Sequence, residues 1–474
     1  MNSEKIDSLA EAVPAEVGLK EACTAEARPA EIGLKEACTA EAVPAGAAGE
    51  CMSEGCPAER TAFRDPGNNY KENTEINTEI KNTVCQGDYP PDTSLYLHIP
   101  FCIRKCSYCD FLSSPQDEGT REEYVQALIR EILVQGDCFS GTKVDTIFFG
   151  GGTPSVLTEK QISRIMEAVH ASFSVLPDAE ISMEMNPGTA EPDKLVAFRQ
   201  AGINRLSIGV QSLHDDELRL LGRIHTASQA ETAFRQAREA GFKNINIDLI
   251  SALPGQTPEK WEYNLSKAIN WKPEHISAYS LIIEPGTAFA EMQGKGQLPP
   301  VPGEEEDRTI YHTTGKVLSR AGYHQYEISN YALLGKECRH NIGYWTGHEY
   351  LGLGIGAASY IRGCRFSNTP DLSFYLETLK KAADGSDLES IREEAHSLTE
   401  KEKMEEFMFL GLRMTDGTDA GEFERRFGRS LESVYGDVIR RHIRQGVVER
   451  TRKGIRLTAR GIDVSNYVLA DYLL

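Results

Sequence analysis

From residue 94 onward, short apolar runs alternate with longer stretches in which apolar residues recur at helical spacing. The apolar runs are 95–100, 145–154, 180–188, 205–212, 244–255 and 275–286. Each run is apolar or β-branched at first and turns polar, or rich in glycine and proline, at its end. The stretches between them, for example 121–136 and 159–173, have the spacing of surface helices. This alternation predicts βα units with a parallel sheet.

Six such units are fewer than the eight that close a (β/α)8 barrel. We therefore expect an α/β fold built on a partial, open-sided (β/α)6 barrel over residues 89–325. In a parallel barrel the strand ends and the loops that follow them open on one face, where active sites lie. Side chains at the ends of the six runs are therefore the first candidates for a functional site.

Two further regions follow the predicted barrel. Residues 326–397 form a connecting region that carries the motif HNIGYW (340–345). Residues 398–474 combine helical patterns with a short β-wing at 447–461, an order that resembles a winged helix. This segment holds 14 Lys and Arg against 13 Asp and Glu, which is too small an excess of positive charge for DNA binding. We expect a capping or docking domain and no nucleic-acid partner.

The first 88 residues have a different composition. The segment AEAVPAEVGLKEACT (10–24) recurs as AEARPAEIGLKEACT (25–39), an imperfect repeat with a proline in each copy. Proline limits helix length, and only Phe63 and Tyr70 are aromatic in this region. Because little apolar surface can offset the entropy lost on ordering, the sequence predicts a low-complexity, disordered extension over residues 1–88.

Composition and charge narrow the class of protein further. The chain has 474 residues, of which 40% are hydrophobic, and a net charge of −20. It has no apolar run of the length of a membrane helix and no secretory signal pattern, so we expect a cytoplasmic protein without a membrane span. Eleven cysteines in such a protein favour metal or redox chemistry over disulfides.

Three of the cysteines follow the first apolar run directly. Cys102, Cys106 and Cys109 form the pattern C-x3-C-x2-C and would lie in the first βα loop. Thiolates hold iron–sulfur clusters, and three of them can bind three irons of a [4Fe–4S] cubane and leave the fourth iron open. Two other interpretations remain, namely a zinc site, which generally wants four closed ligands, and three unrelated cysteines.

With Tyr108 just before its third cysteine, the triplet resembles the signature of radical S-adenosylmethionine (SAM) enzymes. In that family the amine and carboxylate of SAM chelate the open iron, and an electron from the reduced cluster cleaves SAM to a 5′-deoxyadenosyl radical. The resemblance implies a [4Fe–4S] cluster held by Cys102, Cys106 and Cys109, a SAM site, and an electron donor for the cluster.

The later strand ends are similar to those of the anaerobic coproporphyrinogen III oxidase family within the radical SAM enzymes. GGGTP (150–154) closes the second run, and polar residues follow at the ends of later runs in the order of that family. The resemblance covers about residues 88–474. It implies a SAM site lined by Tyr96, Tyr108, Gly151, Gly152, Thr153, Glu184, Gln211, Arg223 and Asp248.

Two functions divide this family, and the residues bear on the choice between them. In the true oxidases of porphyrin biosynthesis, the cysteine pattern is C-x3-C-x2-C-x-C. This chain resembles that pattern except that Phe111 occupies the position of the fourth cysteine. Its C-D-F form and its HNIGYW motif instead resemble the HemW-type haem chaperone subfamily. That resemblance implies haem as a ligand, with His340 or Cys338 on its iron, and haem-accepting respiratory proteins as partners.

Two alternatives stay open on the residues alone. One is oxygen-independent coproporphyrinogen III oxidase activity, because the cluster motif and the SAM-facing residues are intact. The residues therefore do not decide whether the chain is an enzyme. The other concerns His340, since a single histidine is commonly a hydrogen-bonded structural residue and the following Tyr344 and Trp345 are residue types typical of a core.

Overall fold

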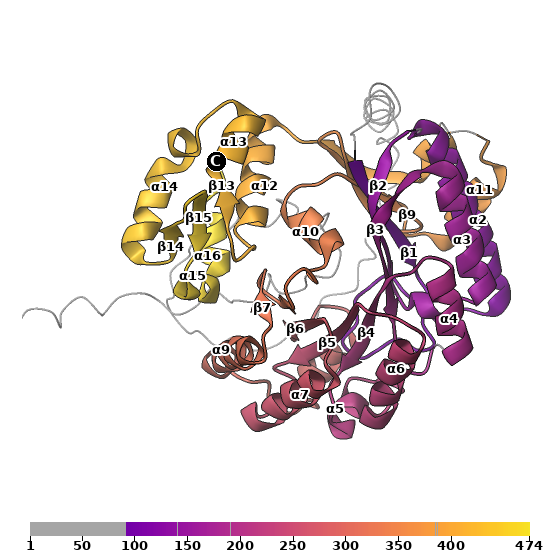
Figure 1. The fold of residues 1–474 in the computed structure, drawn as a ribbon, viewed down its shortest axis with the longest axis horizontal. Helices are drawn as coiled ribbons and strands as arrows, with labels where there is room; N and C mark the ends of the chain where they lie inside the picture. Colours follow the sequence, from indigo (N-terminus) through magenta and orange to yellow (C-terminus); the bar gives the residue numbers. More distant parts are fainter. Residues whose placement is uncertain (1–91, 140, 190, 384, 386) are drawn as a thin grey trace, which may run out of the picture.

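The computed structural model describes residues 92–139, 141–189, 191–383, 385 and 387–474. The disordered extension predicted for residues 1–88 lies outside these described residues. Figure 1 shows a curved sheet with helices along its outer face and a smaller C-terminal unit facing its open side.

All six predicted runs form strands, which pair side by side in sequence order. They are β1 (Asp92–Ile99), β2 (Lys143–Gly151), β3 (Ser174–Met185), β4 (Arg205–Gln211), β5 (Ile245–Ser251) and β6 (His275–Ser280). Every neighbouring pair is parallel. The connecting helices are α2 (Glu118–Cys138), α3 (Glu159–Ser172), α4 (Pro192–Gln200), α5 (Asp215–Leu220), α6 (Ala227–Glu239) and α7 (Pro258–Trp271). The partial (β/α)6 barrel is confirmed.

Alternation along each strand separates a packed outer face from a polar inner face. Along β1, Leu95, Leu97 and Ile99 are fully buried in the main core, against the helices. Tyr96 and His98 point to the other side of the sheet, as successive strand residues must. The inner face of the curved sheet therefore carries the polar side chains from which a site can be built.

The connecting region lengthens the sheet at both edges, which the sequence did not predict. Its strands are β8 (Asn330–Ala332), β9 (Tyr350–Leu353), β10 (Ala358–Ile361), β11 (Cys364–Asn368) and β12 (Arg392–Ser397), and β7 (His324–Gln325) precedes it directly. β8 pairs with β6 at one edge, whereas β9 pairs with β1 at the other. The described strands of this sheet run in the order β12-β11-β10-β9-β1-β2-β3-β4-β5-β6-β8-β7.

Helix α10 (Arg339–Trp345) lies across the open side of the barrel. The chain leaves β8 at one edge of the sheet and enters β9 at the opposite edge, so the helix between these strands must cross the opening. In Figure 1 it lies between the inner face of the sheet and the C-terminal unit. The HNIGYW motif is therefore held against the barrel interior.

A buried carboxylate fixes this sheet extension to the barrel. Glu131 of α2 is fully buried and accepts hydrogen bonds from Gly354 N at 2.8 Å, Asn368 Nδ2 at 2.7 Å and the Tyr375 hydroxyl at 2.6 Å. Burial raises the pKa of Glu131 above its usual value, although these donors oppose the shift. The contacts join the first helix of the barrel to the turn after β9 and to β11. The strand that follows α10 is therefore anchored to the barrel.

The C-terminal unit has the predicted helical and winged form. Its elements are α12 (Glu400–Gly411), β13 (Thr418–Asp419), α13 (Ala420–Phe427), α14 (Leu431–Gln445), β14 (Val448–Arg450), β15 (Gly454–Leu457), α15 (Ala459–Asp463) and α16 (Ser465–Ala470). It has its own apolar core. The guanidinium of Arg413 lies 4.6 Å from the ring centre of Trp345, which joins this unit to α10.

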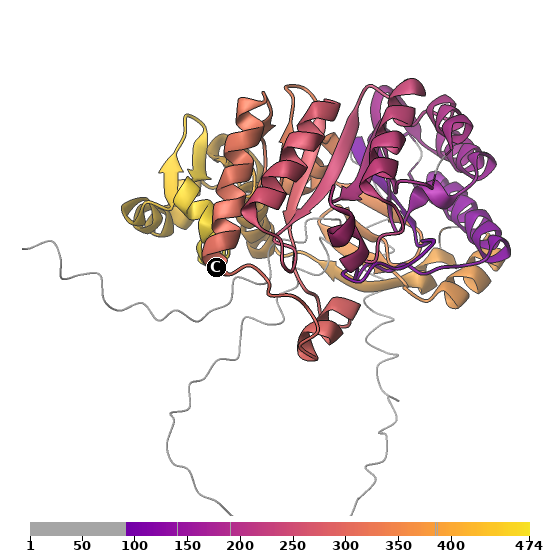
Figure 2. The ribbon, with the colours of Figure 1, turned by 90° about the horizontal axis from the view of Figure 1, so that it is seen from below.

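The remaining helices of the described residues are α8 (Ala288–Gly294), α9 (Glu304–Arg320) and α11 (Leu372–Lys381). Figure 2, seen from below, shows α8 projecting away from the sheet. Over the described part of the chain, no helix is both long and apolar enough to cross a bilayer.

Candidate functional site

The three cysteines lie in a closed loop at the end of β1. Cys102 N donates to Ser114 O at 3.2 Å and Ser114 N donates to Pro100 O at 3.0 Å, so the loop returns to its own base. The Lys105 ammonium donates to Phe111 O at 3.0 Å across the loop. The three cysteines are half-buried. The predicted position of the triplet, in the first βα loop, is therefore where the structure places it.

A chain of hydrogen bonds links two of the cysteines through residues from other strands. Cys102 Sγ lies 3.5 Å from Thr153 Oγ1, and Thr153 Oγ1 accepts from Asn186 Nδ2 at 2.7 Å. Arg223 donates through Nη2 to Asn186 Oδ1 and through Nη1 to Cys106 Sγ at 3.5 Å. A guanidinium therefore lies beside one of the predicted cluster ligands, and the thiolate is the form of cysteine that binds metal. Asn186 was not predicted from the sequence.

The third thiol of the triplet has a raised pKa. Burial, together with Cys106 and Cys102, raises the pKa of Cys109 to about 12, although a hydrogen bond at Phe111 opposes the shift. Among the described residues, no three His, Cys, Asp or Glu side chains are grouped closely enough for one metal ion. A [4Fe–4S] cubane places each thiolate on a different iron, so its ligands do not need to converge on one atom, and this donor set fits such a cluster.

The glycine loop after β2 packs directly on the cysteine loop. Gly152 N donates to Ile99 O at 2.9 Å, and a Cβ at Gly152 would lie only 2.7 Å from Phe101 O. Gly151 has a φ of +109°, and a Cβ there would lie 2.5 Å from the His98 ring. Both positions therefore require glycine. Gly151 N donates to Glu184 Oε2 at 3.1 Å, which brings two of the predicted SAM residues together.

The side chain of His98 links β1 to the cysteine loop. Its Nδ1 lies 3.1 Å from the Tyr96 hydroxyl and its Nε2 lies 2.9 Å from Leu112 O. The ring therefore joins the inner face of β1 to the far end of the cysteine loop. It also forms the surface on which Gly151 packs.

Other predicted SAM residues meet at the ends of β4 and β5. A Cβ at Gly209 would lie 3.0 Å from Gln211 Nε2 and 3.2 Å from Arg223 Nη2, so these two side chains close over that glycine. Gln211 itself has a φ of +67°, a strained conformation for a residue other than glycine. Asp248 is buried and accepts from Ser207 Oγ at 2.9 Å and Asn246 Nδ2 at 2.6 Å. Burial raises its pKa.

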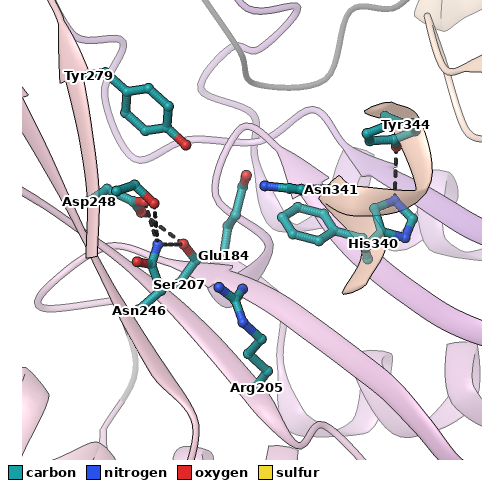
Figure 3. A pocket seen from close by; sticks show the side chains of 11 residues that line it. Glu184, Arg205, Ser207, Asn246, Asp248, Tyr279, His340, Asn341 and Tyr344 are labelled. Carbon is teal, nitrogen blue, oxygen red and sulfur yellow. Dashed lines mark hydrogen bonds between the residues drawn. The ribbon is translucent and has the colours of Figure 1, made fainter. Parts of the chain in front are cut away.

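One pocket joins two of the predicted SAM residues to the HNIGYW motif. Glu184 and Asp248 line it from the sheet, and His340, Asn341 and Tyr344 line it from α10. Figure 3 shows Asn341 reaching toward Glu184 while the guanidinium of Arg205 enters from the β4 side. Residues at least 92 positions apart in the sequence therefore face the same space.

His340 is enclosed in this pocket, with only 1% of its surface exposed. Its Nδ1 lies 2.8 Å from Thr146 Oγ1 and its Nε2 lies 2.9 Å from the Tyr344 hydroxyl. The ring stacks on Phe148 with 5.1 Å between centres, and Phe148 stacks in turn on Tyr96. Burial lowers the pKa of His340 to about 3, so the imidazole is neutral, as a metal ligand must be.

Glu180 anchors α10 to β3, and the sequence analysis missed it. Its carboxylate accepts from Arg339 N at 3.2 Å, His340 N at 3.3 Å and the Cys338 thiol at 3.4 Å. Cys338, the second predicted iron ligand, is fully buried at this contact. The sequence could have indicated this residue, because Glu180 and Glu184 are four positions apart in one strand and must lie on the same face of the sheet.

Arg205 is a second residue that the sequence analysis missed. Only 2% of its surface is exposed. Burial lowers its pKa, but the electrostatic effect of the acidic groups around it, Glu180 and Asp248 among them, outweighs burial and raises it. Because burial raises the pKa of the Cys338 thiol to about 12, that thiol is uncharged at neutral pH. The two carboxylates are therefore what balances the buried guanidinium.

Of the nine predicted SAM residues, only Glu184 and Asp248 line this pocket. Tyr108, for example, packs with Leu221, Ile250 and Phe289 in a small apolar cluster. Trp345 of the HNIGYW motif faces Arg413 of the C-terminal unit. Of the motif HNIGYW, it is therefore the histidine, the asparagine and the tyrosine that line the pocket.

Comparisons with known proteins agree with this architecture. The sequence profile of the radical SAM superfamily matches residues 96–267, and that of the HemN C-terminal domain matches residues 398–464. Coproporphyrinogen III oxidase (HemN) from Escherichia coli, a radical SAM enzyme of known structure, is 26% identical with a TM-score of 0.71. That match covers 84% of this chain and 93% of the oxidase.

Higher identity is found with proteins named heme chaperone HemW. The Bacillus subtilis protein is 37% identical over 381 residues, which cover 80% of this chain and 99% of the relative. The Lactococcus lactis protein is also 37% identical, with 80% and 97% covered. The Escherichia coli protein is 42% identical over 269 residues, with 56% and 70% covered. The chain therefore belongs to the HemW family of radical SAM proteins.

Proposed function

We propose that this protein is a haem chaperone that holds a [4Fe–4S] cluster, SAM and haem and passes haem to respiratory proteins in the cytoplasm. The observation that carries the proposal is the shared pocket, in which His340 of the HNIGYW motif faces Glu184 and Asp248. Similarity to heme chaperones over nearly their whole length supports it.

Cys102, Cys106 and Cys109 would hold the cluster, which then needs an electron donor. When bound and reduced, the cluster would supply one electron to SAM. The side chains and glycines proposed to line the SAM site are those of Tyr96, Tyr108, Gly151, Gly152, Thr153, Glu184, Gln211, Arg223 and Asp248. Most of them are joined by the hydrogen bonds and close contacts described above.

His340 is the proposed haem ligand, because a neutral imidazole nitrogen is a common axial ligand of haem iron. In the described conformation, His340 Nε2 is hydrogen-bonded to the Tyr344 hydroxyl and His340 is only 1% exposed. Haem binding therefore requires the Tyr344 end of α10 to move away from Nε2. A seven-residue helix between two short strands has few backbone hydrogen bonds to lose in such a movement.

Replacing His340 by alanine is expected to weaken haem binding by more than about tenfold, since even the loss of a ligand's supporting partner costs 10–100-fold in metal affinity. Haem titration of the reconstituted protein, followed at the Soret band, measures this. His396→Ala is the matched control, because that side chain is exposed and pairs with Glu402 outside the pocket. Equal haem affinity of the His340 variant and wild type would remove His340 as the ligand.

Oxygen-independent coproporphyrinogen III oxidase is the second candidate, favoured by the structural match to the Escherichia coli oxidase. We expect no protoporphyrinogen from coproporphyrinogen III under strict anaerobiosis, because this chain has Phe111 at the position of the fourth cysteine in the oxidase pattern. Porphyrin analysis by chromatography, with cluster, SAM and reductant present and the Escherichia coli oxidase in parallel, measures this. Formation of the product would overturn the chaperone proposal.

A further inference from the structure

The two nitrogens of His340 have different partners, and the partners determine which nitrogen carries the proton. Behind Nδ1 lies a buried row of oxygens: Thr146 Oγ1 donates to Ser94 Oγ at 2.8 Å, and Ser94 Oγ donates to Asp145 Oδ1 at 3.2 Å. Thr146 is fully buried and Ser94 is 3% exposed. Water therefore does not compete for the bond between Thr146 and Ser94.

The direction of this row follows from its end. A carboxylate only accepts hydrogen bonds, and each hydroxyl has a single proton to donate. Asp145 therefore receives the proton of Ser94, and Ser94 receives that of Thr146. With its own proton committed, Thr146 Oγ1 accepts from His340, so Nδ1 carries the N–H.

Charged groups around Asp145 keep it an acceptor. His348 Nε2 lies 3.4 Å from Asp145 Oδ1, and Arg339 Nη2 lies 3.8 Å from Oδ2. Burial opposes ionisation, but the hydrogen bond and charge of His348, with Ser94 and Arg339, lower the pKa of Asp145 below its usual value. The acceptor end of the row is therefore maintained at neutral pH.

Because Nδ1 carries the proton, Nε2 carries the lone pair. That lone pair accepts from the Tyr344 hydroxyl at 2.9 Å. Stacking on Phe148, with an angle of 23° between the rings, limits rotation of the imidazole. The imidazole is thus held in one tautomer and one orientation, with Nε2 toward Tyr344 (Figure 3).

We propose that Thr146, supported by Ser94 and Asp145, is the positioning residue of the haem ligand, and that the Tyr344 hydroxyl is the group haem iron displaces from Nε2. This inference rests on the proposed function. Metal-bound histidines nearly always donate their second N–H to a fixed acceptor, which sets the tautomer and raises ligand basicity. Displacement exchanges an O–H···N hydrogen bond for an Fe–N bond, with no proton or electron transferred between the groups.

Thr146→Val keeps the shape of the side chain and removes the hydroxyl, whereas Thr146→Ser keeps the hydroxyl. We expect the valine variant to bind haem about 10- to 100-fold more weakly than wild type and the serine variant to bind as wild type does. Haem affinity is measured by Soret titration with the full-length, cluster-loaded chain. Nitrogen-15 chemical shifts of His340 before haem is added report the tautomer, which should have the proton on Nδ1 in wild type.

Tyr344→Phe supplies a second variant, which tests the other nitrogen without altering the buried row. Removing the competing hydrogen bond should tighten haem binding about 2- to 10-fold, the equivalent of one neutral hydrogen bond. Weaker haem binding by this variant would show that the tyrosine itself supports the iron, and would overturn its role as the displaced group.

The outcomes separate this inference from the proposed function. If His340→Ala weakens haem binding and Thr146→Val does not, the haem ligand stands and the positioning role is overturned. A wild-type spectrum with the proton on Nε2 overturns it as well. If His340→Ala binds haem normally, both the proposed ligand and this inference fail.

Discussion

Replacing Cys106 by alanine is expected to leave the anaerobically reconstituted protein with at least about tenfold less iron and acid-labile sulfide than wild type. The proposed cluster has three protein ligands, so the variant retains two. Loss of a partner that merely supports a metal ligand already costs about 10–100-fold in affinity, and loss of the ligand itself costs more. Iron and sulfide are assayed per chain after removal of unbound metal.

The structure offers a matched control for this prediction. Cys138 lies at the end of α2, outside the cysteine loop, and is half-buried as Cys106 is. Cys138→Ser should keep the wild-type content of iron and sulfide. Normal content in Cys106→Ala would contradict the assignment of the triplet. Bound zinc without sulfide in wild type would favour the four-ligand alternative instead.

The barrel could be predicted because its signals are local and repeated. Six apolar runs, each followed by a helical stretch, allow few topologies when parallel connections are short and right-handed. The ends of the runs were less certain. The last run was expected to extend to residue 286, whereas β6 ends at Ser280 and the chain continues as a loop before α8.

The position of α10 could not be predicted, because it depends on pairing between distant residues. β8 and β9, which hold its two ends, are three and four residues long and too short to show a periodic pattern. Their partners, β6 and β1, are the two edges of the barrel. Only this pairing shows that His340 faces the same pocket as Glu184.

The site was predicted in part. Residues at strand ends were found, since their order along the chain is itself the signal. Asn186, Glu180 and Arg205 were missed because each is a single polar residue in or beside an apolar strand, and its partners are far away in the sequence. Asn186 bridges the two side chains that reach Cys102 and Cys106. Glu180 accepts hydrogen bonds from the start of α10, and Arg205 is the buried positive charge near two carboxyl groups.

Replacing Glu180 by alanine is expected to lower the free energy of unfolding by about 1–3 kcal/mol, the usual cost of leaving buried donors without their acceptor. Three donors at the start of α10 lose their acceptor, and the buried guanidinium of Arg205 loses one of its balancing charges. The shift of the urea midpoint at constant slope measures the loss.

Two further variants separate the charge from the hydrogen bonds. Glu180→Gln keeps the shape and one acceptor oxygen but removes the charge, so its loss of stability should be smaller than that of alanine. Combining Glu180→Gln with Arg205→Met removes both charges, so the double variant leaves no buried guanidinium without its balancing carboxylate. The double variant should therefore regain part of the stability lost by Glu180→Gln alone.

The same variants bear on haem binding, because Glu180 holds the helix that carries His340. If the Tyr344 end of α10 must move for haem to reach Nε2, weakening the anchor at the start of the helix raises the population of the open form. Glu180→Gln should then bind haem more tightly than wild type, although it is less stable. Unchanged stability of Glu180→Ala would contradict the anchor. Weaker haem binding by Glu180→Gln would indicate that haem binds with α10 in the pocket as it is described here.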